Sequence, residues 1–408
     1  MHLLAAILLS VNFLTSHPIT GQANMSVLVQ NLNTGEVIDN YRSEHVVPPA
    51  SVMKLLTTGA ALEILGPGFR FPTLLEYSGY VENGTLHGNL YIHGGCDPSL
   101  GWQGQTAFLY QWVKAVQQAG IKRIDGGVVA DMTMLDGEAQ NPSWLCEDAG
   151  NYYAPGIFAL NYYGNTMNIV LKSGEPGSVA SVVKTEPAVE DVYFINHIRC
   201  GKITYDGAFV SGLPFSRERY LTGAVPSNLG TFGVKGDLPN PGLLLARHFT
   251  NRLREAGISV KNEANYEADY NPLTTARTEL YIHYSEPLSE IIKDGCGLAP
   301  QDAVSAKTFV QLLTIMSRST NQEAWLASLP VSGQSGTLKS LCPGTPLEGR
   351  IHAKSGTIAG TKNFAGYIDM PNGETWVFAI LINSAPGKAK NIQTVIQQYL
   401  LDVYKAHQ

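Results

Sequence analysis

The stretch Pro48-Pro49-Ala50-Ser51-Val52-Met53-Lys54-Leu55-Leu56 decides how this chain folds. The two prolines favour extended backbone and cannot continue a helix, so we expect a helix to begin close to Ser51. Apolar residues follow at helical spacing as far as Leu62, as a buried helix requires. Ser51 and Lys54 are three residues apart and should therefore share one face of this helix.

This Ser-x-x-Lys pair has the chemistry of an activated nucleophile. A serine hydroxyl is a poor nucleophile until a base removes its proton, and a lysine held in a dry site can lose its charge and act as that base. A helix N-terminus adds backbone N–H groups and positive potential where an oxyanion would form. The plainer alternative is that Ser51 caps the helix and Lys54 is solvated. A second copy, Ser181-Val182-Val183-Lys184, lies in a β-like run, so the motif alone does not establish a site.

A second motif, Lys354-Ser355-Gly356-Thr357, lies at the end of a predicted strand. A lysine there can bind a substrate carboxylate, and Gly356 would let a substrate backbone approach closely. The N–H of Thr357 would complete an oxyanion hole with that of Ser51. Taken alone, Lys354 is equally well explained as a solvated strand-end lysine, and Lys172-Ser173-Gly174 is a similar sequence followed by a turn.

Composition limits the classes of protein to which the chain can belong. Its 408 residues predict two or three domains, and 44% hydrophobic with 15% charged residues is typical of a globular protein. A formal charge of −6 without a long Lys/Arg cluster argues against a nucleic-acid partner. The five cysteines form no Cys-x-x-Cys pair and no His-Glu-x-x-His occurs, so we expect neither a metal nor another cofactor.

The first residues are typical of an export signal. Residues 3–9 are apolar but too few to span a bilayer, and small residues up to Ala23 predict cleavage there, with residues 1–23 as the signal peptide. No later stretch reaches membrane-spanning length. We therefore expect a soluble protein exported to the periplasm or beyond.

The two ends of the chain have similar predicted structure. Residues 26–30 and 36–38 predict a hairpin around Asn33-Thr34-Gly35, and residues 364–368 and 376–382 predict another around Pro371-Asn372-Gly373. The second hairpin is followed by a helix with apolar residues at helical period. We expect one α+β domain, an antiparallel sheet flanked by helices, from residues 24–80 and 275–408. Residues 81–274, rich in short strands and turns, would form a large insertion.

The order and context of the two motifs resemble the penicillin-recognising serine enzymes. More narrowly, nearly the full length resembles the D-Ala-D-Ala carboxypeptidase/endopeptidase family of low-molecular-mass penicillin-binding proteins, peptidase family S13. The segments that carry the resemblance include His93-Gly94-Gly95-Cys96-Asp97-Pro98-Ser99-Leu100, Asn151-Tyr152-Tyr153-Ala154-Pro155, Ser285-Glu286-Pro287-Leu288, Asp294-Gly295-Cys296-Gly297-Leu298 and Gly336-Thr337-Leu338.

The resemblance implies a β-lactamase/transpeptidase-like domain and a serine peptidase that acts on peptidoglycan. Ser51 would be acylated by the D-Ala-D-Ala unit of a stem peptide, with Lys54 as general base, and water would then hydrolyse the ester. Lys354, Ser355 and Thr357, with Gly356 between them, would hold the terminal carboxylate. β-Lactams would acylate the same serine. Whether carboxypeptidase or endopeptidase activity dominates stays open.

One family motif is missing from its expected place. Relatives carry Ser-x-Asn, whose serine shuttles protons and whose asparagine holds the substrate amide, several tens of residues before Asp-Gly-Ser-Gly-Leu. Here Lys293 runs directly into Asp294, so the segment that should hold the motif is absent. Ser319-Thr320-Asn321 matches by letters, but its neighbours align with a later, non-catalytic helix end, and we do not assign it. Losing positioned acid/base help typically costs about 10²–10⁴-fold in rate.

Two other classes of function remain open on the sequence. One is a catalytically deficient penicillin-binding-protein homologue that only binds cell-wall peptide. The other is a serine β-lactamase or esterase. Gly333-Gln334-Ser335-Gly336 is followed by Thr337, so the chain lacks a Gly-x-Ser-x-Gly hydrolase elbow at this point.

Overall fold

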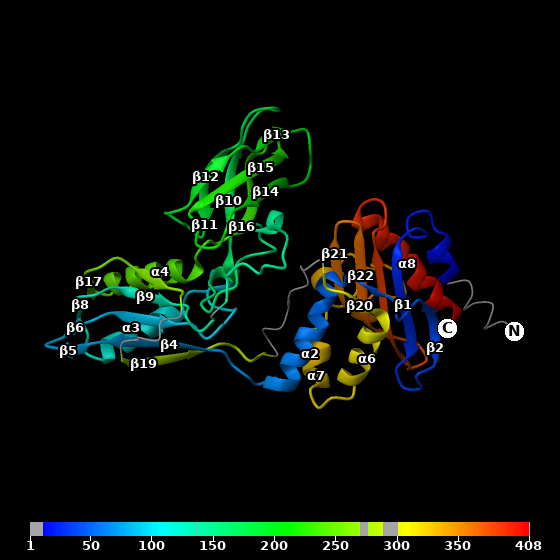
Figure 1. Cartoon of the computed structure of the whole chain (residues 1–408), viewed down its shortest axis with the longest axis horizontal. Coiled ribbons are helices and arrows are strands. Elements are labelled where there is room, and N and C mark those ends of the chain that lie inside the picture. Colours follow the sequence, from blue (N-terminus) through cyan, green and yellow to red (C-terminus); the bar gives the residue numbers. More distant parts are fainter. Residues whose placement is uncertain (1–10, 136, 270–275, 289–300, 408) are drawn as a thin grey trace. The chain divides into compact units, whose positions relative to one another are not determined.

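The computed structural model describes residues 11–135, 137–269, 276–288 and 301–407. The chain divides into two compact units, shown in Figure 1. Unit 1 comprises Met1–Phe69 and Pro287–Gln408, and unit 2 comprises Arg70–Glu286. Unit 2 is thus inserted into unit 1 and starts at Arg70 rather than at residue 81. The reason is that β4 (Pro72–Ser78) pairs with both β7 (Leu90–His93) and β19 (Arg277–Tyr284), so the chain on either side of the expected boundaries belongs to one sheet of unit 2.

Unit 1 is organised around a sheet with the strand order β2-β1-β23-β22-β21, in which every neighbouring pair is antiparallel. The strands are β1 (Asn24–Asn31), β2 (Val37–Tyr41), β21 (Ile351–Ile358), β22 (Thr361–Asp369) and β23 (Thr375–Asn383). The β1–β2 hairpin turns at Gly35, whose φ of 73° suits glycine. β1 pairs along its whole length with β23, which confirms that one sheet is assembled from both ends of the chain.

Helices cover both faces of this sheet. They are α2 (Lys54–Leu65), α6 (Ala306–Met316), α7 (Gln322–Ser328) and α8 (Ala389–Ala406). The apolar face of α8 shares a core with alternate residues of β23, including Phe378 and Ile380. On the opposite face, the Tyr367 hydroxyl of β22 donates to the Leu313 carbonyl of α6 at 2.6 Å and accepts from Trp325 Nε1 of α7 at 2.9 Å. The expected antiparallel sheet flanked by helices is confirmed.

Part of the predicted leader belongs to the fold. Residues 11–16 are helical, and Leu14 is only 1% exposed within the core of unit 1. The Thr20 hydroxyl, also buried, donates to the Leu14 carbonyl at 2.6 Å. Cleavage after Ala23, as the sequence predicted, would therefore remove a buried core residue.

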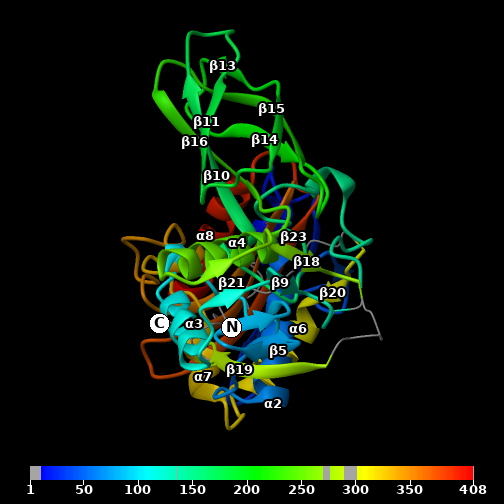
Figure 2. The same ribbon diagram turned by 90° about the vertical axis from the view of Figure 1, so that its left-hand side faces the viewer.

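The described residues of unit 2 form four sheets and two α-helices, and Figure 2 shows the strands from β10 (Thr166–Ser173) to β16 (Gly230–Asp237) at one end of the unit and α3 and α4 at the other. The helices are α3 (Phe108–Gln118) and α4 (Pro241–Glu255). The sheets of the α3–α4 end have the orders β18-β9-β7-β4-β19 and β17-β8-β6-β5. Their strands are β4 (Pro72–Ser78), β5 (Tyr80–Glu82), β6 (Thr85–His87), β7 (Leu90–His93), β8 (Arg123–Ile124), β9 (Val128–Asp131), β17 (Ser259–Val260), β18 (Asn265–Glu267) and β19 (Arg277–Tyr284).

The remaining strands of unit 2 form the sheet β11-β10-β16 and the sheet β12-β15-β13, with β14 paired to β15. They are β10 (Thr166–Ser173), β11 (Ser181–Glu186), β12 (Tyr193–Asn196), β13 (Arg199–Gly201), β14 (Gly207–Ser211), β15 (Glu218–Pro226) and β16 (Gly230–Asp237). A further two-stranded pair, β3 (Val46–Val47) with β20 (Val304–Ser305), belongs to unit 1.

The segment that follows His93 is a packing element of unit 2. A Cβ on Gly95 would lie 1.8 Å from the Pro72 carbonyl oxygen, so only glycine fits there. The Asp97 carboxylate accepts from the Ser99 N–H at 2.8 Å and from its hydroxyl at 2.6 Å, while burial raises the pKa of Asp97. These contacts support the turn-stabilising role expected of an Asp-Pro turn.

The cysteines are free thiols wherever the structure describes them, at Cys96, Cys146, Cys200 and Cys342. Cys296 and the rest of the Asp294–Leu298 motif lie outside the described residues. Within the described ranges, no group of His, Cys, Asp and Glu side chains is arranged to hold a metal ion. No described helix is long and apolar enough to cross a membrane.

Candidate active site

The side chains of Ser51 and Lys54 are in contact. Ser51 lies in a 3₁₀ turn, η1 (Ala50–Met53), and the α-helix α2 begins at Lys54. The Lys54 Nζ lies 2.9 Å from the Ser51 Oγ, and both residues are half-buried. The helix starts slightly later than predicted, but the pair is close enough for direct proton transfer.

The backbone before the nucleophile is strained and held in place. Ala50 has a φ of 46°, in the left-handed region, and its side chain is buried. Such a conformation costs about 1–3 kcal/mol and persists only where its surroundings enforce it. The Asn363 Nδ2 of β22 donates to the Pro48 and Pro49 carbonyls, each at 3.0 Å, and its Oδ1 accepts from the Ile382 N–H at 2.8 Å. Asn363 therefore ties the turn before Ser51 to the central strands of the sheet.

The strand β21 passes directly beside Ser51. A Cβ on Gly356 would lie 2.7 Å from the Pro49 carbonyl oxygen and 3.2 Å from the Ser51 nitrogen. Any side chain at this position would push the strand and the nucleophile turn apart. Lys354 is two residues before Gly356 and so points to the same face of the strand. Its side chain is buried, and its Nζ donates to the Ser355 carbonyl at 2.8 Å. The structure thus brings the two predicted motifs together.

The two hydroxyls of the second motif have partners that the sequence analysis did not assign. The Ser355 hydroxyl donates to Thr337 Oγ1 at 2.8 Å, from the short turn η5 (Gly336–Leu338). Thr357 is exposed, and its Oγ1 accepts from the Lys362 Nζ at 2.9 Å. Thr337 lies in a segment that carries the family resemblance, and this segment could have indicated that Thr337 lies near the site. Lys362 could be found only from the strand register that sets it opposite Thr357.

The Ser-x-Asn look-alike lies away from Ser51, as the alignment context indicated. Asn321 Nδ2 donates to the Leu62 carbonyl and to Glu63 Oε1, both at 3.1 Å, and the Ser319 hydroxyl also donates to Glu63. Glu63 is ~13 Å along α2 from Lys54 at 1.5 Å per residue. Ser319 and Asn321 therefore fasten the α6–α7 connection to the far end of α2. The junction of Lys293 with Asp294 lies outside the described residues.

The second Ser-x-x-Lys copy has no catalytic geometry. Ser181 and Lys184 lie on β11, and both side chains are exposed. The Lys184 Nζ forms an ion pair with Glu186 Oε1 at 2.6 Å. This pair is a solvated surface contact.

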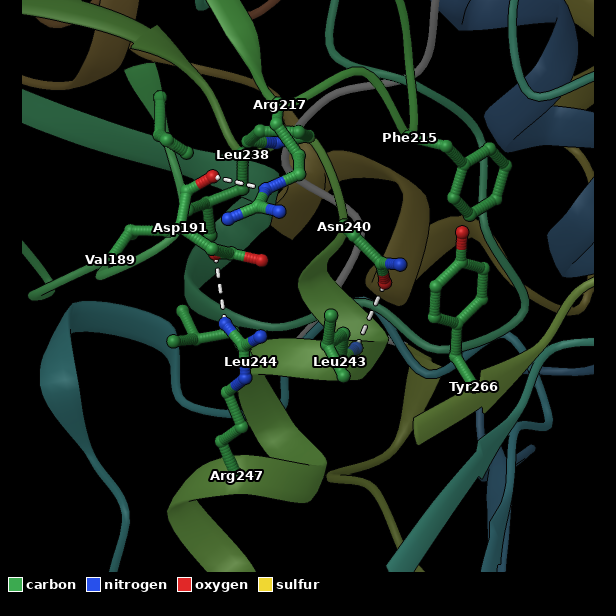
Figure 3. A pocket seen from close by; sticks show the side chains of 12 residues that line it. Val189, Asp191, Phe215, Arg217, Leu238, Asn240, Leu243, Leu244, Arg247 and Tyr266 are labelled. Carbon is green, nitrogen blue, oxygen red and sulfur yellow. Dashed lines mark hydrogen bonds and ion pairs between the residues drawn. The ribbon is translucent and has the colours of Figure 1, made fainter. Parts of the chain in front are cut away.

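A separate pocket of about 100 Å³ lies within unit 2 and is shown in Figure 3. Its polar groups largely satisfy one another: Arg247 pairs with Asp191 at 2.8 Å, and Asn240 caps α4 by accepting from the Leu243 N–H at 2.9 Å. The twelve residues that line it include neither serine nor lysine. The candidate active site is therefore the Ser51 region of unit 1.

Comparisons with known proteins agree on one family. The sequence matches the model of the D-Ala-D-Ala carboxypeptidase 3 (S13) family over residues 9–294 and 289–403. The two matched segments meet near the point where the Ser-x-Asn segment is missing, and the match includes residues that the sequence analysis assigned to a leader.

Characterised relatives are similar over most of their length. A D-alanyl-D-alanine carboxypeptidase from Actinomadura sp. (strain R39) is 27% identical over 474 residues, which cover 98% of this chain and 85% of the relative. The D-alanyl-D-alanine carboxypeptidase DacB of Haemophilus influenzae is 24% identical over 419 residues, which cover 88% of this chain and 85% of the relative. The crystal structure of penicillin binding protein 4 from Haemophilus influenzae has the same fold, with a TM-score of 0.79 and 22% sequence identity. The match covers 96% of this chain and 98% of that protein. Because the family match spans nearly the whole chain, this protein belongs to the D-Ala-D-Ala carboxypeptidase 3 (S13) family.

Proposed function

We propose that this chain is a serine-type D-Ala-D-Ala carboxypeptidase/endopeptidase that cleaves peptidoglycan stem peptides through an acyl-enzyme on Ser51. The observation that carries the proposal is the contact between Ser51 Oγ and Lys54 Nζ at 2.9 Å, directly beside Gly356 of β21. We further propose that the protein acts outside the cytoplasm, where such peptides are found, and that β-lactams acylate the same serine.

This geometry supports acylation of Ser51. The Lys54 amine takes the proton of Ser51 Oγ as that oxygen attacks the carbonyl carbon of the penultimate D-Ala. The N–H groups of Ser51 and Thr357 would stabilise the oxyanion that forms. The C–N bond then breaks, the terminal D-Ala leaves as an amine that gains one proton, and water later hydrolyses the ester.

The edge position of β21 supports binding of an extended peptide. β21 is the last strand of the sheet, and its outer edge is bridged at His352 by Val331. Beyond that bridge no described strand covers the outer edge, so its backbone can pair with a substrate. Lys354, Ser355 and Thr357 lie along this stretch and would hold the terminal carboxylate.

The missing Ser-x-Asn segment limits the rate. The leaving nitrogen must gain a proton, and the chain lacks the serine that shuttles it in relatives. Lys54, which contacts Ser51 Oγ, can return the proton it removed. Since positioned acid/base groups contribute about 10²–10⁴-fold, we expect Ser51 to be acylated slowly by the peptide, and turnover to be slow for that reason.

Release of D-Ala from a peptide tests this function. The wild-type protein should release one D-Ala from diacetyl-L-Lys-D-Ala-D-Ala, measured with D-amino acid oxidase, and should leave the peptide ending in L-Ala intact. Ser51→Ala should release none. Equal release by Ser51→Ala would contradict the proposal, and binding without release by the wild type would favour the catalytically deficient homologue.

A further inference from the structure

Lys362 is a buried cation beside the second motif. It lies near the start of β22, opposite Thr357 in the β21–β22 register, and its side chain is 8% exposed. Its Nζ donates to Thr357 Oγ1 at 2.9 Å and lies 5.0 Å from the centre of the Phe364 ring. In the described part of the chain, no carboxylate forms an ion pair with it.

Two arginines of unit 2 that are fully or largely buried are each matched by an acid. Arg219 is fully buried and forms two hydrogen bonds with Asp237, and Arg277 pairs with Asp131. A buried charge without a counter-ion is costly, and burial accordingly lowers the pKa of Lys362. This lysine therefore lies where an anion from outside the protein would compensate its charge.

The hydrogen-bond direction shows how that anion would be bound. Thr357 Oγ1 accepts from the lysine, which leaves the hydroxyl proton of this exposed threonine available for another acceptor. A hydroxyl that accepts from a cation becomes a stronger donor, because hydrogen bonds in a chain polarise one another. The Thr357 hydroxyl, polarised by Lys362, is thus available as a donor to a ligand on the β21 edge.

We propose that Lys362 is a positioning residue that acts through Thr357 to select peptides ending in a free α-carboxylate. The proposal rests on the function proposed above and adds a residue that determines specificity. Lys362 orients and polarises the Thr357 hydroxyl, and that hydroxyl donates to the carboxylate. A peptide ending in a neutral carboxamide would gain little from this arrangement.

Binding measured in the Ser51→Ala background tests the proposal without any chemistry. The two ligands are N-acetyl-D-Ala-D-Ala and its C-terminal carboxamide, titrated by calorimetry. Ser51→Ala should bind the acid about 10- to 100-fold more tightly than the amide, as expected for a charge-assisted hydrogen bond. Adding Lys362→Met should weaken binding of the acid by a similar factor and leave binding of the amide unchanged. Lys362→Arg should retain most of the preference.

A double-variant comparison separates this role from a structural one. Thr357→Val removes the hydroxyl and keeps the buried lysine, so this variant should also lose the preference for the acid over the amide. Adding Lys362→Met to Thr357→Val should reduce the preference little further. Lys235→Met is the matched control, because Lys235 is an exposed lysine over the Tyr152 ring at 5.9 Å. Equal binding of acid and amide by Ser51→Ala, binding of neither, or additive losses in the double variant would overturn the inference. Failure of the wild type to release D-Ala would instead contradict only the proposed function.

Discussion

Replacing Lys54 with methionine is expected to slow acylation of Ser51 by a β-lactam by about 10²–10⁴-fold, the usual contribution of a positioned general base. The Lys54 Nζ at 2.9 Å from Ser51 Oγ is the base assigned to this serine. Methionine keeps the unbranched shape of the side chain and removes the amine, so the helix that begins at position 54 should persist. The nucleophile would remain in place but keep its proton.

The second-order rate of labelling by a fluorescent penicillin measures this effect. Lys184→Met provides a matched control, since Lys184 is the lysine of the second Ser-x-x-Lys sequence but forms an exposed ion pair with Glu186. The control should label at the wild-type rate. A Lys54→Met protein that labels as fast as Lys184→Met would show that another group activates Ser51.

Replacing Arg219 with methionine is expected to destabilise unit 2 by about 3–5 kcal/mol. Arg219 and Asp237 are buried, and the guanidinium donates to both carboxylate oxygens, at 2.7 and 2.9 Å. The same guanidinium donates to the carbonyls of Leu213, Ser216 and Glu218. Removing it would leave a buried carboxylate without its counter-ion and three carbonyls without this donor.

Urea denaturation followed by circular dichroism measures this loss. Removing the exposed Lys184–Glu186 pair with Lys184→Met should change the free energy of unfolding by less than about 1 kcal/mol. A change of similar size in Arg219→Met would mean that the buried pair contributes no more than a surface pair. The comparison therefore shows whether burial of the pair, rather than its charge alone, causes the loss of stability.

Much of unit 1 follows from local patterns in the sequence. The hairpin at Gly35, the strands β22 and β23 and the closing helix α8 are predicted by turn residues and apolar period alone. The Ser51–Lys54 contact also follows from local spacing, because residues three apart meet on a helix. These predictions succeed because the interactions involved lie within a few residues of one another.

The rest depends on contacts between distant segments. Asn363 holds the turn before Ser51 because its side chain reaches the Pro48 and Pro49 carbonyls. Lys362 contacts Thr357 because the strand register sets the two residues opposite each other. Neither relation is visible from spacing along the chain. Leu14 lies in the predicted leader, and its packing in the core of unit 1 likewise depends on contacts with distant segments. Unit 2 begins at Arg70 rather than at residue 81 because β4, near its start, pairs with β19, near its end.

The most direct test of the account is to locate the covalent adduct of benzylpenicillin by mass spectrometry. We expect the intact protein to gain the mass of one penicilloyl group, with the modified residue found at Ser51 after proteolysis. Ser51→Ala should gain no adduct. An unmodified wild-type protein, or an adduct on any residue other than Ser51, would contradict the claim that the serine beside Lys54 and β21 is the nucleophile.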